Sequence, residues 1–247
     1  MDIRQYLDST YLETAQSKGI SQEENLAIAS LYIKEAIEHN FKLIMIRPDV
    51  VSTARKMIDE AGSNVLVGTV IAFPEGTASI DEKLAEAREV IENGADELDF
   101  VVNYPMYKRG KVETISEEVR RCTELVLNAG KTAKWIIETA ALREDEIEGI
   151  CELIKDTVID NFGEENAHRV FLKTSTGFYK TENGKPAGAT IEALEVMKEW
   201  GSPLPLKAAG GVRDMATAIK MIEMGVTRIG TSSALKLYSE GSTSSSY

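Results

Sequence analysis

The stretch TIEALEVMKEWGSPLPLKAAGG, residues 190–211, contains the structural unit that decides the fold. Its first half places apolar residues at helical spacing, and the apolar run 205–209 predicts a short buried strand. Gly201 separates the two, at the position where many helices end on a residue with positive φ. The glycine pair 210–211 then opens a loop. The stretch therefore predicts a helix, a glycine turn, a strand and a second flexible turn.

The same unit recurs along the 247 residues, with glycines 62, 94, 130 and 225 at the position that Gly201 takes. The expected helices are 21–40, 50–62, 79–94, 114–129, 142–160, 190–201, 214–225 and a last one from Ser233. The expected strands are 42–46, 65–73, 97–102, 133–139, 169–173, 205–209 and 228–232. A weak pattern at 6–10 adds an eighth strand.

Continuous apolar strands that alternate with amphipathic helices predict a parallel sheet covered by helices. Eight such units in about 250 residues fit a single (β/α)₈ TIM barrel, and a doubly wound open sheet is the alternative. No linker-like composition divides the chain. We therefore expect one barrel domain over residues 1–238, followed by a flexible serine-rich tail over 239–247.

Composition narrows the classes of partner. A net charge of −12 argues against nucleic acid and anionic membranes, but it leaves room for one phosphate on a small ligand. The start MDIRQYLDST lacks the apolar region of a signal peptide, and no apolar run approaches the length of a membrane span. The two cysteines, Cys122 and Cys151, suit buried thiols in a reducing cytoplasm. We expect a cytoplasmic protein, without a membrane or nucleic-acid partner.

Charged side chains stand in or at the ends of several predicted strands, and the active site of such a barrel lies at the carboxyl ends of its strands. They include Asp99, Lys134, Glu138, Lys173 and Lys207. Lys173 is either a structural ion-pair partner or a Schiff-base nucleophile, whose pKa burial and the neighbouring Lys207 would lower. Asp99 is either an ion-pair partner of Lys134 or a proton shuttle, and these two roles are compatible.

Two glycine- or serine-rich loops, 208–214 and 230–234, follow the last two predicted strands. Loops in these places often bind phosphate in barrels, although a tight turn and a helix cap are the simpler explanations. The chain has no dinucleotide or NTP motif, and its two histidines are too few for a metal cluster. We read the charged run at 79–90 as a solvated helix face.

Six motifs, in order along the chain, resemble those of the deoxyribose-phosphate aldolase family. They are LDSTYL (7–12), GADELDFVVN (94–103), KWIIET (134–139), KTSTGF (173–178), KAAGGVR (207–213) and GTSS (230–233). The resemblance implies a class I aldolase on a (β/α)₈ barrel that needs no metal and no cofactor. It implies reversible cleavage of 2-deoxy-D-ribose 5-phosphate to D-glyceraldehyde 3-phosphate and acetaldehyde, so that the partners are small phosphosugars and aldehydes.

The resemblance also implies residue roles. Lys173 would form the Schiff base, Lys207 would lower its pKa, and Asp99, supported by Lys134, would relay protons. The positions that match substrate and phosphate contacts are Asp8, Thr10, Thr176, Gly177, Gly210, Gly211, Gly230, Ser232 and Ser233. We further expect a homodimer.

Two positions differ from those of some relatives, and a third lies at the end of the tail. Met45 stands where some relatives have a cysteine, so a reactive enal would find no thiol there. Phe178 stands where some relatives have a lysine near the phosphate. Tyr247 ends the tail, which is either an appended segment or a flexible arm that brings the tyrosine hydroxyl over the barrel mouth.

Other functions stay open at this stage. Another Schiff-base sugar-phosphate lyase, or a transaldolase-like barrel, would use the same lysines. A pyridoxal-phosphate protein also needs a lysine and a phosphate loop, but it would be yellow. A non-catalytic phosphosugar-binding barrel would leave the paired lysines unexplained.

Overall fold

Eight parallel strands close into a barrel in the computed structural model, which describes residues 1–182 and 186–244. Each strand pairs with the next, and β1 pairs with β8. The strands are β1 (Leu7–Tyr11), β2 (Leu43–Ile46), β3 (Leu66–Ile71), β4 (Glu97–Val101), β5 (Thr132–Ile136), β6 (Val170–Lys173), β7 (Leu206–Ala209) and β8 (Val226–Thr231). The predicted (β/α)₈ barrel is confirmed, and β1 is the strand that the weak pattern at 6–10 indicated.

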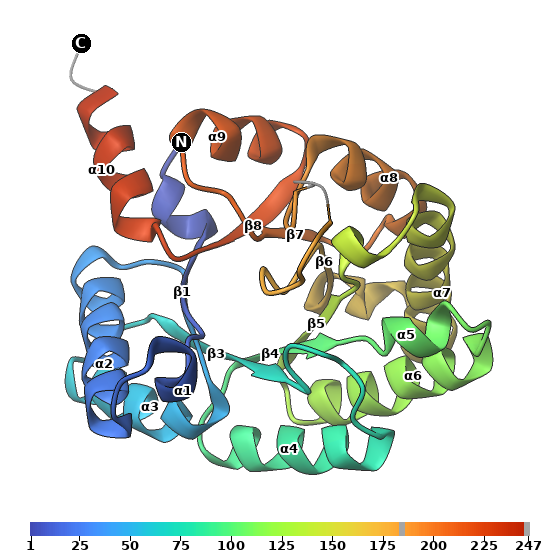
Figure 1. Ribbon diagram of the computed structural model, residues 1–247, viewed down its shortest axis with the longest axis horizontal. Helices are drawn as coiled ribbons and strands as arrows, with labels where there is room; N and C mark the ends of the chain where they lie inside the picture. The colour runs from blue at the N-terminus through green and yellow to red at the C-terminus, as the bar shows by residue number, and fades with distance from the viewer. Residues whose placement is uncertain (183–185, 245–247) are drawn as a thin grey trace.

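Helices surround the ring of strands (Figure 1). The α-helices are α1 (Ala15–Lys18), α2 (Gln22–His39), α3 (Val51–Glu60), α4 (Ile80–Glu92), α5 (Tyr104–Tyr107), α6 (Val112–Asn128), α7 (Glu144–Phe162), α8 (Ile191–Gly201), α9 (Met215–Glu223) and α10 (Ala234–Ser244). Short 3₁₀ helices span η1 (Ile3–Tyr6), η2 (Pro48–Val50), η3 (Thr139–Ala141) and η4 (Glu164–Arg169). Sequence chemistry sets several helix starts: Ser21 and Glu24 form a capping box at α2.

The two faces of the strands enter different environments. The outward face packs against the helices in one large apolar core, in which Trp135 stacks on Phe100. Part of the inward face forms a small separate apolar cluster that contains Leu43, Met45 and Val70. The barrel interior also holds charged side chains, with the Phe171 ring next to Lys134 and Arg228. Met45 is thus fully buried inside the barrel.

Four of the five glycines that were predicted to end a helix have the expected backbone conformation. Glycines 62, 94, 130 and 225 all have positive φ, as expected for residues that end a helix. Gly201 is different, because it lies in the last turn of α8 and its φ is not positive. A Cβ there would come within 2.1 Å of Leu172 Cδ1. The expected role of Gly201 was therefore wrong: the glycine lets α8 pack closely on β6.

The charged run at 79–90 is not wholly solvated, as it had been predicted to be. Lys83 on α4 is fully buried, forms an ion pair with Glu118 of α6, and donates a 2.6 Å hydrogen bond to the carbonyl oxygen of Val101. A buried ammonium group needs such partners. The pair therefore joins two helices to the carboxyl end of β4, which a helical charge pattern alone does not indicate.

The carboxyl-terminal helix α10 continues to Ser244, past the boundary that was predicted at 238. The backbone of the first part of the predicted tail is thus helical. Tyr247 lies outside the described residues, and its role stays a prediction.

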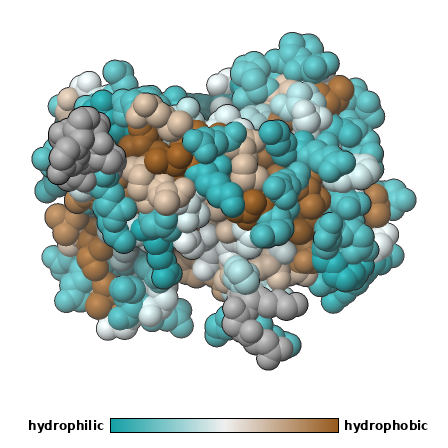
Figure 2. All heavy atoms as spheres, turned by 90° about the horizontal axis from the view of Figure 1, so that it is seen from above, coloured by the Kyte–Doolittle hydropathy of each residue, from teal (hydrophilic) through white to brown (hydrophobic). Residues whose placement is uncertain are grey.

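The surface in view in Figure 2 is largely hydrophilic. Figure 2 shows hydrophilic residues over much of one side of the molecule, with hydrophobic residues between them. Within the described residues, every helix is too short or too polar to cross a membrane. Cys122 and Cys151 are both buried free thiols, and burial raises the pKa of Cys122 to about 12.

Candidate active site

Seven charged side chains form one connected cluster inside the barrel. All are buried, because the strands that carry them turn these positions toward the barrel interior. The anionic members are Asp8 of β1 and Glu97 and Asp99 of β4, and the cationic members are Lys134 of β5, Lys173 of β6, Lys207 of β7 and Arg228 of β8. We call this set the lumen cluster.

Asp99 is the centre of the lumen cluster. Its Oδ1 accepts a 2.8 Å hydrogen bond from Lys134 Nζ. Its Oδ2 accepts two more, from Lys173 Nζ and Lys207 Nζ, each at 2.8 Å. The two lysine nitrogens therefore lie no farther apart than twice that distance, well inside the roughly 10 Å over which salt and water screen charges. Lys173 and Lys207 are also direct register partners on β6 and β7.

The cations of the lumen cluster differ in how many carboxylates they contact. Lys134 contacts Glu97 as well as Asp99, and Lys207 contacts Asp8 as well as Asp99. Arg228 contacts both Asp8 and Glu97, at 2.7 and 2.9 Å. Among the residues that the structure describes, Lys173 has Asp99 as its one carboxylate partner. It is thus the least neutralised cation of the cluster.

The pKa shifts follow from these contacts. Burial and the positive charges of Lys207 and Lys134 lower the pKa of Lys173 to about 8, although Asp99 opposes the shift. Burial would also lower the pKa of Lys134, but Asp99 and Glu97 raise it above its usual value. Burial would raise the pKa of Asp99, yet the three lysine charges hold it well below its usual range. Lys173 is thus an amine with a pKa lowered toward the neutral range, and it lies beside a carboxylate whose pKa is held low.

A cavity of about 600 Å³ opens at the carboxyl ends of the strands, above the lumen cluster. The predicted site residues that line it are Thr10, Lys173, Thr176, Gly177, Gly210, Gly211, Gly230 and Ser232. Lys173 is 3% exposed, and it is the member of the lumen cluster that reaches this cavity. Its position joins the charged interior to the space that a ligand would occupy.

Other predicted residues lie outside the lining of the cavity. Asp8, Asp99, Lys134 and Lys207 belong to the lumen cluster, and all four are fully buried. Met45 lies in the apolar cluster inside the barrel. Ser233 directly precedes α10, where its amide donates to the Thr231 hydroxyl.

The glycines of the cavity are favoured by a positive φ or by the close approach of neighbouring atoms. Gly177 and Gly210 both have positive φ, a backbone conformation that favours glycine. Gly210 also packs tightly against Gly188, where a Cβ would come within 2.0 Å of the Gly210 carbonyl oxygen. Gly230 is small for a different reason: a Cβ there would lie only 3.1 Å from Lys207 Cε. It leaves room for the Lys207 side chain.

Sequence reasoning missed two members of the lumen cluster, Glu97 and Arg228. The signal for Glu97 was its spacing: it stands two residues before Asp99, on the same face of β4. The signal for Arg228 was a lone cation in an apolar strand. Lys18 and Arg213 also line the cavity and were not singled out as site residues.

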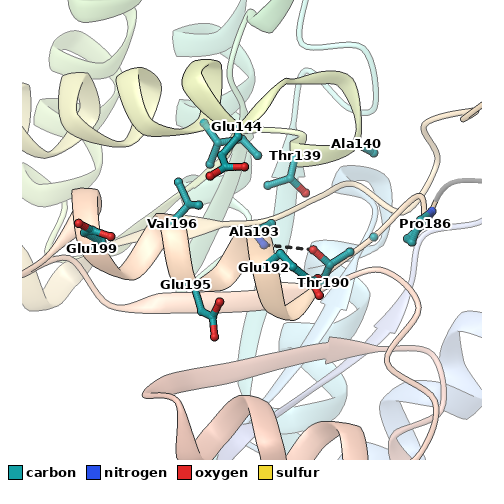
Figure 3. A pocket seen from close by; sticks show the side chains of 12 residues that line it. Thr139, Ala140, Glu144, Pro186, Thr190, Glu192, Ala193, Glu195, Val196 and Glu199 are labelled. Atoms are coloured by element: carbon teal, nitrogen blue, oxygen red, sulfur yellow. Dashed lines mark hydrogen bonds between the residues drawn. The ribbon is translucent and has the colours of Figure 1, made fainter.

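A second cavity of about 520 Å³ lies between α7 and α8 (Figure 3). Carboxylates dominate its polar lining: Glu144, Glu192, Glu195 and Glu199. None of the predicted site residues lines it, and it lacks an amine nucleophile among its described lining residues. The cavity above Lys173 is therefore the candidate active site.

Comparisons with known proteins identify the family of the chain. The family model described as DeoC/LacD family aldolase matches residues 14–240. A deoxyribose-phosphate aldolase from Thermococcus gammatolerans is 35% identical over 238 residues, which are 96% of this chain and 95% of the relative.

Solved structures of aldolases have the same fold as this chain. QR15, an aldolase, superposes with a TM-score of 0.80 at 31% identity, over 98% of this chain and 97% of its own. The tetrameric deoxyribose phosphate aldolase from Aeropyrum pernix gives a TM-score of 0.78 at 26% identity, over 98% and 91%. The family match over most of the chain, with a buried lysine at the barrel mouth, shows that the chain belongs to the deoxyribose-phosphate aldolases, carbon–carbon lyases of the DeoC/LacD family.

Proposed function

We propose that this aldolase reversibly cleaves 2-deoxy-D-ribose 5-phosphate to D-glyceraldehyde 3-phosphate and acetaldehyde through a Schiff base on Lys173. The observation that carries the proposal is the position of Lys173. It is the cation of the lumen cluster that contacts one carboxylate, that lines the cavity, and that has a pKa lowered to about 8. An amine must be neutral to attack a carbonyl, and these three features favour the neutral form.

The balance of charge in the lumen cluster supports this assignment. With Lys173 protonated, four cations face three carboxylates in a medium of low dielectric constant. When Lys173 is neutral, the remaining cations Lys134, Lys207 and Arg228 match Asp8, Glu97 and Asp99 in number. Buried charge is costly unless it is paired, so deprotonation of Lys173 relieves an excess.

In the cleavage direction, the neutral Lys173 amine attacks the substrate aldehyde carbon to form a carbinolamine. Loss of water then gives an iminium ion. Removal of the proton from the substrate 3-hydroxyl sends the electron pair of the C2–C3 bond into the iminium, which releases D-glyceraldehyde 3-phosphate and leaves an enamine. Protonation of the enamine carbon and hydrolysis release acetaldehyde and free the amine.

Asp99 is well placed to relay the protons of these steps. Its Oδ2 accepts from both Lys173 and Lys207, and its low pKa keeps it a carboxylate that passes protons on rather than holding them. Lys134 holds Oδ1 and so fixes the orientation of the carboxylate. In this proposal Asp8 positions Lys207, which it contacts at 2.6 Å.

The distal phosphate would bind at the glycine loops on the far side of the cavity. The loops of Gly210, Gly211 and Gly230 allow backbone amides to approach an anion closely. Lys18 and Arg213 add positive charge to the same lining. Phe178 contributes none: its ring packs edge-on against Phe73, with 5.2 Å between centroids. Amides and these two cations would take the place of the lysine that some relatives have at this position.

Reductive trapping tests the proposal. We expect that acetaldehyde with borohydride adds one ethyl group to the protein and that peptide mapping places it on Lys173. Exposed lysines serve as the internal control, because their protonated amines react more slowly at neutral pH. Absence of the adduct, or its appearance on Lys207 instead, contradicts the assignment. A protein that is yellow as isolated would point to pyridoxal phosphate.

The same proposal includes a cytoplasmic location and assembly as a homodimer. The two buried free thiols suit a reducing compartment.

Exposed apolar side chains on α2, Leu26 and Leu31, offer surface that a second copy could cover. Light scattering is expected to give twice the mass of one chain, and the mass of a single chain would contradict the dimer.

A further inference from the structure

Glu138 is a buried carboxylate that the mechanism above does not use. It follows β5 and is 1% exposed. Its backbone has φ 58° and ψ 64°, a left-handed conformation that few residues other than glycine adopt. Strain of this kind tends to be retained at functional sites. The flanking residues are fixed, since Ile137 N donates to the Lys173 carbonyl and Thr139 N to that of Thr174.

The carboxylate of Glu138 holds the loop that follows the Schiff-base lysine. Its Oε2 accepts hydrogen bonds from Thr176 N at 3.2 Å and from Thr176 Oγ1 at 2.5 Å. Within the described part of the chain, Oε1 has no hydrogen-bond partner. Burial raises the pKa of Glu138, while Thr176 and the nearby Lys173 oppose that shift. The group that Glu138 controls is therefore Thr176.

These bonds determine what the Thr176 hydroxyl can do. Its proton is donated to Glu138, and one of its lone pairs accepts a 3.0 Å hydrogen bond from Phe178 N. The second lone pair remains, and Thr176 lines the cavity. A hydroxyl held in this way can only accept a hydrogen bond from a ligand. It favours a substrate that presents a donor at that place.

We propose that Glu138 is a positioning residue that fixes the Thr176 hydroxyl as a hydrogen-bond acceptor and so makes the cavity selective for acceptor aldehydes with a 2-hydroxyl group. This inference rests on the proposed function. Thr176 lies in the chain between Lys173, which holds the reacting carbon, and Gly177 at the phosphate end of the cavity. The 2-hydroxyl of D-glyceraldehyde 3-phosphate lies between the same two ends of the molecule.

The test compares two acceptors in condensation with acetaldehyde. One is D-glyceraldehyde 3-phosphate, and the other is 3-phosphooxypropanal, which lacks the 2-hydroxyl. We expect the unaltered enzyme to prefer the first by about tenfold or more in kcat/KM, because a buried acceptor left unpaired is costly. Glu138→Ala and Thr176→Val should each bring the ratio close to one, mainly by raising KM for the hydroxylated acceptor.

A double-mutant cycle shows whether Glu138 acts through Thr176. We expect Glu138→Ala to have little further effect on the ratio when Thr176→Val is already present. Glu138→Gln keeps an acceptor oxygen and should restore part of the preference. If Glu138→Ala does not fold, Glu138→Gln replaces it in the double-mutant cycle with Thr176→Val. Glu144→Ala, which removes an exposed carboxylate of α7, is the matched control and should leave the ratio unchanged.

Two results would overturn the role of Glu138: a preference that survives Glu138→Ala, or an effect of equal size in the presence and absence of the Thr176 hydroxyl. Trapping of acetaldehyde separates this failure from failure of the proposed function. A protein that traps acetaldehyde on Lys173 but shows no coupling keeps its proposed function and loses the inference about Glu138. A protein that traps nothing loses both.

Discussion

Replacing Lys173 by methionine is expected to lower kcat/KM by about 10⁴-fold or more while leaving the protein at least as stable to urea as before. Loss of a covalent nucleophile commonly costs activity on this scale. Stability should not fall, because Asp99 keeps Lys134 and Lys207 as partners after the change. The lumen cluster has one more cation than carboxylates, and the replacement removes that additional charge. An apolar side chain also suits a buried site.

Lys134→Met is the matched comparison, since it removes a fully buried lysine of the same cluster. Here both Glu97 and Asp99 lose a direct partner. Removing one member of a buried ion pair costs about 3–5 kcal/mol, and we expect the low end because each carboxylate keeps another partner. Urea denaturation and kcat/KM, measured on both variants, check the contrast. If Lys173→Met is destabilised as much as Lys134→Met, or keeps activity within about tenfold of the unaltered enzyme, then Lys173 has a structural role.

The second large effect is expected in the pH dependence of kcat/KM, which reports on the free enzyme. The pKa of Lys173 is lowered to about 8, so its amine is protonated and unreactive below that pH and neutral above it. Activity should therefore rise with pH, with the midpoint of the rise at about pH 8 and a plateau roughly one pH unit higher. An unshifted lysine would instead place the rise near its ordinary pKa of about 10.4.

Lys207→Met should move this rise to higher pH. The positive charge of Lys207 lowers the pKa of Lys173, and without it Asp99 would stabilise the protonated amine more strongly. Lys56→Met, which removes an exposed lysine of α3, is the control and should leave the profile in place. A profile that stays fixed in Lys207→Met, or moves to lower pH, would show that Lys207 does not tune the nucleophile.

Much of the fold could be predicted because its signals are local. A glycine with positive φ after a helix and a short apolar strand can both be recognised within a few residues. The strand positions of Lys173 and Lys207 follow from the same signals, and the barrel makes them neighbours in register. Even the weak pattern of β1 could be placed, since a barrel needs an eighth strand to close.

The parts that could not be predicted depend on contacts between distant segments. Gly201 has the sequence context of a helix cap, and its packing against Leu172 shows only when α8 lies on β6. Lys83 has the context of a solvated helix face, and its partner Glu118 belongs to another helix. The left-handed backbone of Glu138 has no local sequence signal, because glycine is the residue expected there.

The central claim is that the pKa of Lys173 is lowered to about 8, which makes a share of the neutral amine available near physiological pH. The titration of its nitrogen tests this directly. Nuclear magnetic resonance on protein with isotope-labelled lysine gives that titration, and the signal of Lys173 is assigned by its absence in Lys173→Met. We expect a midpoint at about pH 8. A midpoint close to the ordinary lysine value of 10.5 would contradict the account.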